Sequence, residues 1–248
     1  MINIVLPLAG KGSRFSRAGY KLPKPLIEIN GKPMIEVVVN NLRPARDHRF
    51  IFICQQSHID EFGLDNILKE LEPNSIIIPI DFYTDGQLSS ALLAKPYIDN
   101  DFPLMTANTD QYIDFSIDDY LDTVEKDSLD GLIMTMKGDN PKWSYVRIDE
   151  LTNNVVETAE KKVISNEATV GIYNFKRGSD FVKAAESLID KDLRVNGEFY
   201  ICPVYNELIA RGLRVGYYNV GEERRGMYGL GIPADLEYFL SLPLSRRV

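Results

Sequence analysis

The stretch Ile2–Phe15, INIVLPLAGKGSRF, joins a short apolar run to a loop rich in glycine and basic residues. Ile2–Leu6 is almost continuously apolar, which is typical of a strand buried on both faces, as in a parallel sheet. Ligands of open α/β sheets bind beyond the carboxyl ends of such strands. We therefore expect a parallel sheet with a binding loop directly after its first strand.

Working outward from this stretch, apolar runs alternate with helical patterns up to about residue 110. Further strands are predicted at Phe50–Cys54, Ser75–Ile80 and Pro103–Ala107. The helices between them are predicted at Pro33–Leu42, Ile59–Leu71 and Gly86–Ala94. This order favours parallel strands with helices on both faces of the sheet. The segment Gly10–Ile29 is predicted to be a long functional loop.

The later part of the chain is less regular. Its predicted strands are Gly131–Met136, Ser144–Ile148, Asn154–Thr158, Thr169–Phe175 and Leu213–Val220. Its predicted helices are Ile117–Lys126, Ser179–Ile189, Pro203–Arg211 and Pro233–Leu240. We expect these elements to extend and cap the first sheet without a core of their own. The predicted fold is one α/β domain over residues 1–248, a three-layer sandwich with a mostly parallel mixed central sheet.

The composition is that of a globular protein with an acidic balance. The 248 residues include 28 Lys and Arg against 36 Asp and Glu, so the formal net charge is −8. This excess argues against a general nucleic-acid binder, which usually carries a basic excess. No apolar run approaches the roughly 20 residues of a membrane span, and the first residues lack the basic region and cleavage site of a signal peptide. We expect a cytoplasmic protein with neither a nucleic-acid nor a membrane partner.

Cysteine and histidine carry little functional signal. Cys54 and Cys202 lie far apart in the apolar stretches FIFIC and FYICPVY, so we expect buried free thiols. His48 and His58 flank a predicted strand and have no ligand-like neighbours. Neither a zinc site nor a Ser/His triad is expected.

The loop after the first strand carries the chemistry of an anion site. Gly10 and Gly12 let the backbone approach a ligand closely and adopt a positive φ. Successive backbone N–H groups in such a loop form an anion cradle, and Lys11, Ser13 and Arg14 add donors. A phosphate group is the expected ligand, although a basic surface turn would show the same letters.

Two familiar phosphate-binding motifs do not fit this loop. A Rossmann fingerprint needs a glycine where Phe15 stands. A Walker loop needs Gly-Lys-Ser/Thr after a four-residue gap, whereas Gly12 is followed directly by Ser13.

Lys24 stands between two prolines in Lys21-Leu22-Pro23-Lys24-Pro25. Proline fixes its own φ and keeps the preceding residue extended, so Lys24 is presented on a stiff segment. A rigid lysine beside a phosphate cradle suits the stabilisation of transition-state charge. Without the cradle, Lys24 would be an ordinary solvated lysine in a proline-rich loop.

Three blocks follow one another in order: Leu8–Phe15, Lys21–Pro25 and Ile27–Ile35. Together they resemble the sugar-phosphate nucleotidylyltransferase family, whose pattern is Ala-Gly-x-Gly-Ser/Thr-Arg, then Pro-Lys-Pro, then a Gly-Lys-Pro turn into a helix. The rest of the chain matches more thinly, in the expected order. The resemblance implies a nucleotide-diphospho-sugar-transferase-like fold. It also implies an Mg²⁺-dependent reaction in which a nucleoside triphosphate transfers its nucleoside monophosphate to a small phosphorylated acceptor and pyrophosphate is released.

The resemblance also implies catalytic roles for individual residues. Arg14 would hold the pyrophosphate side and Lys24 would contact the α-phosphate. Asp110 follows a predicted strand and would be an Mg²⁺ ligand, with an Asx turn as the structural alternative. The family's second metal aspartate falls on Gly229, so Asp235 is the remaining candidate for that ligand.

The implied binding positions form two sets. The nucleotide set is Leu8, Ala9, Gly10, Lys11, Gly12, Ser13, Thr84, Gly86, Gln87 and Asn108. The acceptor set is Glu160, Lys161, Gly171, Asn196 and Glu198, with Lys162 where the family has proline. An ordinary turn and helix cap would explain Thr84–Gln87 equally well. The two sets divide the domain into a nucleotide-binding half, 1–115, and an acceptor-binding half, 116–248.

Within the family, the chain looks most like small cytidylyltransferases of capsule pathways, among them those that use CTP and phosphoglutamine, so CTP is the favoured nucleotide. A glucose-1-phosphate thymidylyl- or uridylyltransferase is the alternative. A GT-A-type glycosyltransferase is a rival, although it would not need Lys24 between prolines. A non-catalytic nucleotide-binding protein is another, because of Gly229. The acceptor, the base and the oligomeric state, including a homo-oligomer, stay open.

Overall fold

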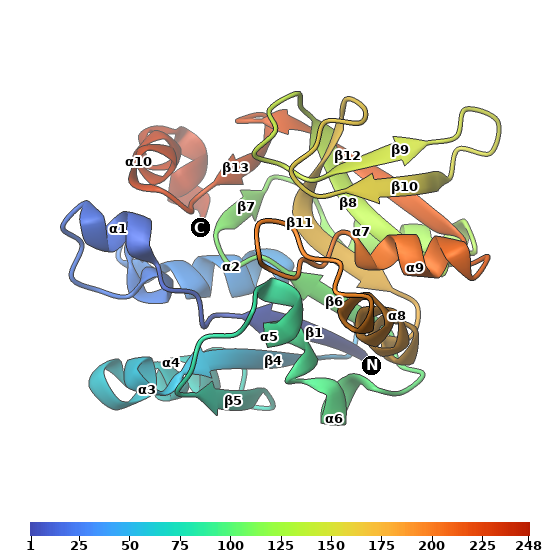
Figure 1. Cartoon of the computed structure of the whole chain (residues 1–248). Coiled ribbons are helices and arrows are strands. Elements are labelled where there is room, and N and C mark those ends of the chain that lie inside the picture. The colour runs from blue at the N-terminus through green and yellow to red at the C-terminus, as the bar shows by residue number, and fades with distance from the viewer.

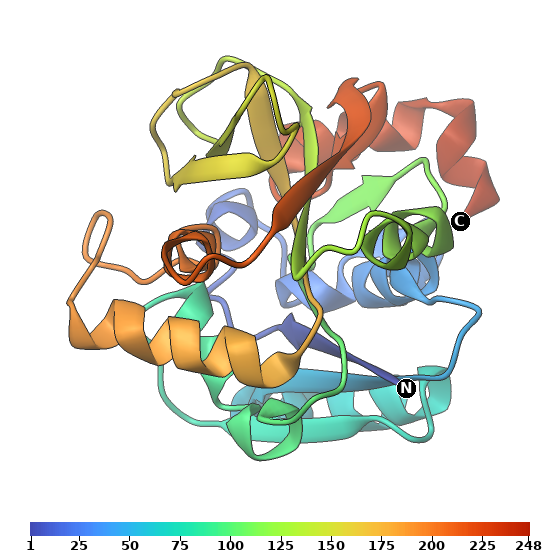
Figure 2. The ribbon, with the colours of Figure 1, turned by 90° about the vertical axis from the view of Figure 1, so that its right-hand side faces the viewer.

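The computed structural model describes residues 1–248 and has a large mixed sheet between two layers of helices (Figure 1, Figure 2). The strands of the main sheet are β1 Ile2–Pro7, β4 His48–Gln55, β5 Ile76–Ile80, β6 Leu104–Ala107, β7 Gln111–Ile113, β8 Gly131–Lys137, β9 Tyr145–Ile148, β10 Val155–Ala159, β11 Glu167–Phe175, β12 Val215–Glu223 and β13 Gly226–Gly229. Two short strands, β2 Glu28–Ile29 and β3 Lys32–Pro33, pair separately.

The helices are short to medium in length. They are α1 Ser13–Arg17, α2 Met34–Leu42, α3 Gln56–Phe62, α4 Leu64–Leu71, α5 Gln87–Leu92, α6 Lys95–Ile98, α7 Ile117–Lys126, α8 Gly178–Asp190, α9 Val204–Ala210 and α10 Pro233–Ser241, with 3-10 turns at Lys24–Leu26 and Pro243–Arg247. None of them has the length and apolar character needed to cross a bilayer.

The strand order explains where a binding site can form. The sheet runs β5-β4-β1-β6-β11-β8-β12-β13-β7. Strands β5, β4, β1 and β6 are mutually parallel, which confirms the arrangement expected for the first part of the chain. Strand β11 is antiparallel to both β6 and β8, so the second part continues the same sheet. The α/β class and the large mixed central sheet are confirmed, and the carboxyl ends of β1 and β6 lie side by side.

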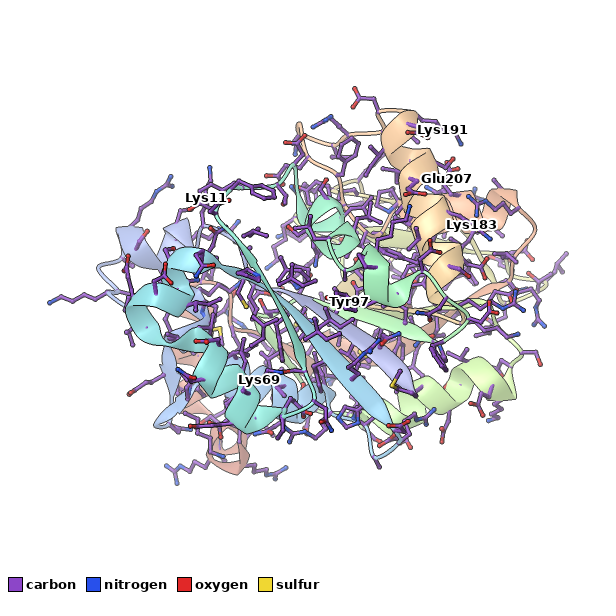
Figure 3. All side chains as sticks on the ribbon, turned by 90° about the horizontal axis from the view of Figure 1, so that it is seen from below. Lys11, Lys69, Tyr97, Lys183, Lys191 and Glu207 are labelled. Atoms are coloured by element: carbon purple, nitrogen blue, oxygen red, sulfur yellow. The ribbon has the colours of Figure 1, made fainter.

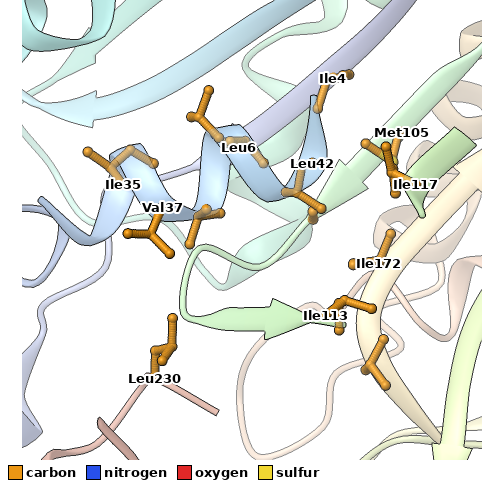
Figure 4. Packing of buried hydrophobic residues seen from close by; sticks show 14 of the residues in the cluster. Ile4, Leu6, Ile35, Val37, Leu42, Met105, Ile113, Ile117, Ile172 and Leu230 are labelled. Carbon is orange, nitrogen blue, oxygen red and sulfur yellow. The ribbon is translucent and has the colours of Figure 1, made fainter. Parts of the chain in front are cut away.

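Helices cover both faces of the sheet, as expected. One layer buries residues of α2, α4, α7 and α10, and the other buries residues of α5, α6, α8 and α9. Ile4 and Leu6 of β1 belong to the first core, where Ile35 and Val37 of α2 pack (Figure 4). Val5 faces the opposite core. Because β1 is buried on both sides, the loop that follows it starts from a rigid base.

Several elements differ in detail from the sequence-based expectation. The helix predicted over Ile59–Leu71 is split into α3 and α4 at Gly63, whose φ of +64° is left-handed and ends the first helix. The predicted loop Gly10–Ile29 contains α1 and a 3-10 turn. Strands β7 and β13 were not predicted, since they have only three and four residues and show no clear alternation.

Both cysteines are buried and free, as predicted. Burial raises the pKa of the Cys54 thiol to about 12, with a smaller contribution from nearby Asp65, and burial likewise raises the pKa of Cys202. Since only thiolates react rapidly, we expect no reaction of the folded protein with Ellman's reagent at pH 8. Unfolding in guanidinium should release both thiols. A thiol that titrates within seconds in the native protein would contradict the buried positions.

Candidate active site

A cavity of about 520 Å³ opens where β1 and β6 end. Most of the residues predicted for nucleotide binding and catalysis line it, together with one residue predicted for the acceptor. The predicted residues in the lining are Leu8, Ala9, Gly10, Lys11, Gly12, Ser13, Arg14, Lys24, Thr84, Gly86, Gln87, Asp110 and Glu198. Asn108, Glu160, Lys161, Gly171, Asn196 and Asp235 do not line it.

The loop after β1 is held in a defined shape. Leu8 N–H donates to the carbonyl of Ile53 at 2.8 Å, which extends the β1–β4 pairing by one residue. Gly12 then takes a φ of +58°, and a Cβ on it would lie 3.3 Å from the Lys24 Cβ. The side chain of Phe15 is buried and packs edge-on against Tyr20 at 5.1 Å between ring centroids. These anchors bring the loop and Lys24 together at the cavity.

Gln55, at the end of β4, joins two of the cavity's loops. Its Nε2 donates to the carbonyls of Ala9, at 3.0 Å, and Phe82, at 3.2 Å. The Gln55 side chain is buried, and its bond to Ala9 is shielded from water. Sequence reasoning missed Gln55, although a polar residue at the end of the apolar run FIFIC is a recognisable signal.

Lys24 and Asp110 meet in the cavity. Lys24 Nζ donates to Asp110 Oδ2 at 2.6 Å, and their side chains are 22% and 30% exposed. Pro23 is extended with ψ of 150°, and Pro25 is buried, so the lysine rises from a fixed backbone. Leu230 N–H donates to the Asp110 carbonyl at 2.7 Å and fixes that residue as well. The Lys24 ammonium, which can bind an anion, and the Asp110 carboxylate, which can bind a cation, therefore lie side by side in the cavity.

The surroundings of Asp110 fit a magnesium ion held by one protein carboxylate. A Cβ on Gly231 would lie 2.5 Å from Asp110 Oδ2, so the glycine leaves space beside that oxygen. Magnesium commonly takes one or two carboxylates and fills its other positions with water and phosphate oxygens. The chain has no cluster of three or more His, Cys, Asp or Glu side chains that could hold a metal ion by themselves.

Asp235 is not brought into the cavity with Asp110. Its Oδ2 would lie 3.2 Å from a Cβ on Gly229, so it fills the space beside the glycine that replaces the expected aspartate. Its Oδ1 is 3.5 Å from Nη2 of Arg224. The structure therefore gives Asp235 an arginine partner outside the cavity lining.

Asn108 and Gly171 do not line the cavity, but they hold the lining residue Gln87 in place. The Gln87 side-chain amide donates to Oδ1 of Asn108, and the Asn108 backbone N–H donates to the Gly171 carbonyl at 2.8 Å. Gly171 has a φ of +81°, and a Cβ there would lie 2.1 Å from Asn108 Nδ2. Only glycine fits at position 171. The close approach places the Asn108 side chain, and its bond to Gln87 then orients Gln87.

Tyr83 is a cavity residue that sequence reasoning missed. Tyr83 is 59% exposed and lines the cavity, and the Lys11 ammonium lies 4.8 Å from the centroid of its ring. Figure 3 shows Lys11 at the outer rim of the molecule. An exposed ring at this edge offers a flat surface for stacking. The signal in the sequence is the aromatic pair Phe82-Tyr83 directly before Thr84.

Tyr200 connects one predicted acceptor residue, Lys161, to another, Glu198, which lines the cavity. Lys161 Nζ donates to Tyr200 Oη at 2.5 Å, and that hydroxyl donates to Glu198 Oε2 at 2.7 Å. Glu160 accepts a hydrogen bond from Ser144, and burial raises the pKa of its carboxyl group. Of these groups, only Glu198 lines the cavity.

Gly86 is a position where added bulk should disturb the site. Its φ is +112°, and a Cβ would lie 2.5 Å from the Phe199 carbonyl oxygen. The left-handed conformation alone costs a non-glycine residue about 1–3 kcal/mol. We expect Gly86→Ala to raise the KM for a triphosphate roughly tenfold or more, because about 1.4 kcal/mol is a factor of ten in affinity.

Gly212→Ala is the matched control for that change. Gly212 also has a positive φ, +78°, but nothing lies within 4 Å of a Cβ placed on it. It therefore carries the backbone strain without the close contact, and its variant should keep the wild-type KM in steady-state assays. Equal KM values for the two variants would show that the approach of Phe199 to Gly86 is unimportant.

The match to a family model covers most of the chain. Residues 3–201 match the model described as nucleotidyl transferase. The chain therefore belongs to the nucleotidyl transferase family, and its class is that of a nucleotidyltransferase. The span includes the loop after β1, Lys24, Asp110 and Glu198, and ends before Asp235.

Individual relatives agree with this class. A nucleoside-diphosphate-sugar pyrophosphorylase from Vibrio cholerae RC9 is 28% identical with a TM-score of 0.83, covering 96% of this chain and 100% of that one. The bifunctional protein GlmU of Methanococcus aeolicus is 26% identical over 88% of this chain and 51% of its own length. The chain thus spans about half the length of that curated relative. The inositol-1-phosphate CTP transferase of T. maritima, 18% identical with a TM-score of 0.74 over 96% of this chain and 94% of that one, shares the fold.

Proposed function

We propose that this chain is an Mg²⁺-dependent nucleotidylyltransferase that joins a nucleoside monophosphate to a small phosphorylated acceptor. The observation that carries the proposal is the convergence of cationic side chains with the Asp110 carboxylate on one cavity. The cations are Lys11, Arg14 and Lys24. Several cations around one cavity suit a polyphosphate chain, and a carboxylate facing the same space suits the divalent ion that accompanies it.

In the proposed reaction, a phosphate oxygen of the acceptor attacks the α-phosphorus of a nucleoside triphosphate. A bond forms between that oxygen and the α-phosphorus. The bond from the α-phosphorus to the bridging oxygen breaks, and pyrophosphate leaves with its electron pair. Lys24 neutralises charge on the α-phosphate, and Arg14 binds the pyrophosphate side. Such a transfer depends mainly on positioning and on cations that are already in place.

Asp110 is the residue that would hold the magnesium ion. When bound, the ion shares the negative charge of the phosphates. Asp235 does not line the cavity and its carboxylate lies 3.5 Å from Arg224, so the proposal rests on Asp110 as the ligand.

The finer proposal is transfer of CMP from CTP to an acceptor used for capsule or other surface-polysaccharide precursors, with phosphoglutamine as one candidate. It is supported by the likeness of this short chain to small cytidylyltransferases of capsule pathways within the family. Glucose 1-phosphate with dTTP or UTP is the alternative, and the likeness to the Vibrio cholerae nucleoside-diphosphate-sugar pyrophosphorylase favours a sugar phosphate.

A pyrophosphate-release screen tests the proposal. It crosses CTP, UTP, dTTP, ATP and GTP with sugar 1-phosphates, phosphocholine-like alcohol phosphates and phosphoglutamine, each with and without Mg²⁺. We expect release that needs one triphosphate, one acceptor and the metal. The preferred pair then identifies the base and the acceptor class.

The same screen separates the rival functions. A glycosyltransferase would release no pyrophosphate. It would instead transfer the sugar of a nucleotide-sugar to an acceptor, so the assay for it is consumption of UDP-glucose that depends on an acceptor. A non-catalytic nucleotide-binding protein would bind a triphosphate in calorimetry and release nothing with any acceptor. Either result would overturn the proposed function.

A further inference from the structure

The loop between α8 and α9 reaches across to the start of α5 (Figure 1). Its two ends are firmly held, because Lys191 Nζ lies 2.7 Å from Glu207 Oε2, joining the end of α8 to α9 (Figure 3). Ser187 Oγ donates to the same carboxylate at 2.8 Å. Between these ends, residues 194–199 turn toward the cavity and carry Glu198 into its lining.

The backbone of this loop is bonded to the loop that carries Gly86 and Gln87. The Phe199 N–H donates to the Asp85 carbonyl at 2.7 Å, and the Leu88 N–H donates to the Phe199 carbonyl at 3.1 Å. Gly86 permits this approach, since a Cβ on it would meet both the nitrogen and the oxygen of Phe199 within 3 Å. These bonds therefore join two segments that are far apart in the sequence.

Arg194 adds side-chain contacts to the same junction. Its Nη1 lies 3.1 Å from Asp85 Oδ2 and donates to the Gly197 carbonyl at 3.0 Å. Its guanidinium carbon lies 4.1 Å from the centroid of the Phe199 ring, and its Nε donates to Asp192 at 2.7 Å. One planar side chain thus closes the tight turn at Gly197 and fastens it to Asp85, a use for which arginine is suited.

The contacts of Arg194 and Phe199 with Asp85 and Leu88, here called the junction, lie between the predicted nucleotide-binding half and the predicted acceptor-binding half. On one side, Thr84, Gly86 and Gln87 line the cavity beside the phosphate loop. On the other, Glu198 accepts from Tyr200, which accepts from Lys161. A change in the 84–88 loop can therefore reach Glu198 by two routes, the backbone bonds of Phe199 and the side-chain contacts of Arg194.

We propose that Arg194 is a positioning residue that couples nucleotide binding at the 84–88 loop to the placement of Glu198 for the acceptor. The proposal rests on the proposed function and adds that binding of one substrate stabilises the loop that binds the other. A nucleotide that fixes the 84–88 loop also fixes Glu198, and an acceptor that fixes Glu198 stabilises the nucleotide loop in return. Such coupling between neighbouring sites is reciprocal.

Hydrogen–deuterium exchange of the full chain tests this coupling with CTP and Mg²⁺ as the probe, and with dTTP and UTP in parallel. In the wild-type protein, we expect the nucleotide to slow exchange in residues 8–15, 84–90 and 195–200. In Arg194→Ala, residues 8–15 and 84–90 should keep their protection. The protection of 195–200 should fall roughly five-fold or more, the lower end of typical coupling factors.

Asp85→Asn removes the same ion pair from the other side and should give the same pattern. Arg147→Ala is the control, because Arg147 forms a comparable exposed pair with Glu157 on the β9–β10 hairpin. It should leave all three segments as in the wild type. Equal protection of 195–200 in wild type and Arg194→Ala would overturn the proposal.

The exchange of the protein alone separates this inference from the proposed function. Without nucleotide, Arg194→Ala should speed exchange of the Leu88 and Phe199 amides, which form the bonds between the loops. If no triphosphate protects residues 8–15, the proposed function fails, while the exchange of these amides still decides whether Arg194 holds the junction. Unchanged amide exchange in the free variant would overturn the inference even where nucleotide binds.

Discussion

Lys24→Ala should lower kcat by roughly 10²–10³-fold, because a fixed charge-stabilising donor commonly contributes about 3 kcal/mol to lowering a reaction barrier. The lysine rises between Pro23 and the buried Pro25, so its ammonium is placed before substrate arrives. Alanine removes the charge without disturbing this backbone. The lost pair with Asp110 is partly exposed, and such pairs stabilise the fold by only about 0–1 kcal/mol.

The measurement is steady-state kcat for the triphosphate and acceptor found by the pyrophosphate-release screen, together with the thermal midpoint. Lys21→Ala is the matched control, because Lys21 is an exposed lysine three positions earlier that does not line the cavity. It should retain wild-type kcat. Turnover of Lys24→Ala within twofold of Lys21→Ala would remove Lys24 from the mechanism.

The first part of the fold was predictable because its signals are local. Continuous apolar runs such as Ile2–Leu6 identify buried strands, and the regular alternation with helices favours parallel neighbours. The phosphate loop and the Pro-Lys-Pro block then follow from residues adjacent in sequence. Strand order brings Lys24 and Asp110 to one edge, since β6 pairs directly with β1.

The second part was less predictable because its placement depends on long-range pairing. Nothing local in Glu167–Phe175 indicates that β11 runs antiparallel between β6 and β8. That crossing brings the loop after α8 to the 84–88 loop, so Glu198, predicted for the acceptor, lines the cavity with the nucleotide residues.

The partner of a side chain on a helix could not be predicted from the sequence, as Asp235 shows. Asp235 stands in the first turn of α10, where its sequence position next to a glycine-rich stretch gave no clue to its partner. The helix places its carboxylate beside Arg224 and Gly229, and Asp235 does not line the cavity. Gly231 was likewise unpredicted, because its role is the space it leaves beside Asp110.

Asp110→Asn should abolish the magnesium-dependent reaction while the protein stays folded. The amide is nearly the same size but carries no charge, and magnesium prefers the oxygen of an ionised carboxylate. Since no other carboxylate lines the cavity except Glu198, the chain offers little to replace it. We expect at least a roughly 10²–10³-fold loss of kcat, as for other groups that stabilise phosphoryl charge, and no recovery at high Mg²⁺.

Manganese binding provides a readout apart from turnover. Titration of Mn²⁺ followed by electron paramagnetic resonance, in the presence of the triphosphate, should show weaker binding in Asp110→Asn than in the wild type. Asp114→Asn is the control, because Asp114 is an exposed carboxylate four positions later and does not line the cavity. Its Mn²⁺ affinity and Mg²⁺ response should be those of the wild type. An unchanged Mg²⁺ dependence in Asp110→Asn would mean that the ion is held elsewhere, and that Asp110 serves only to orient Lys24.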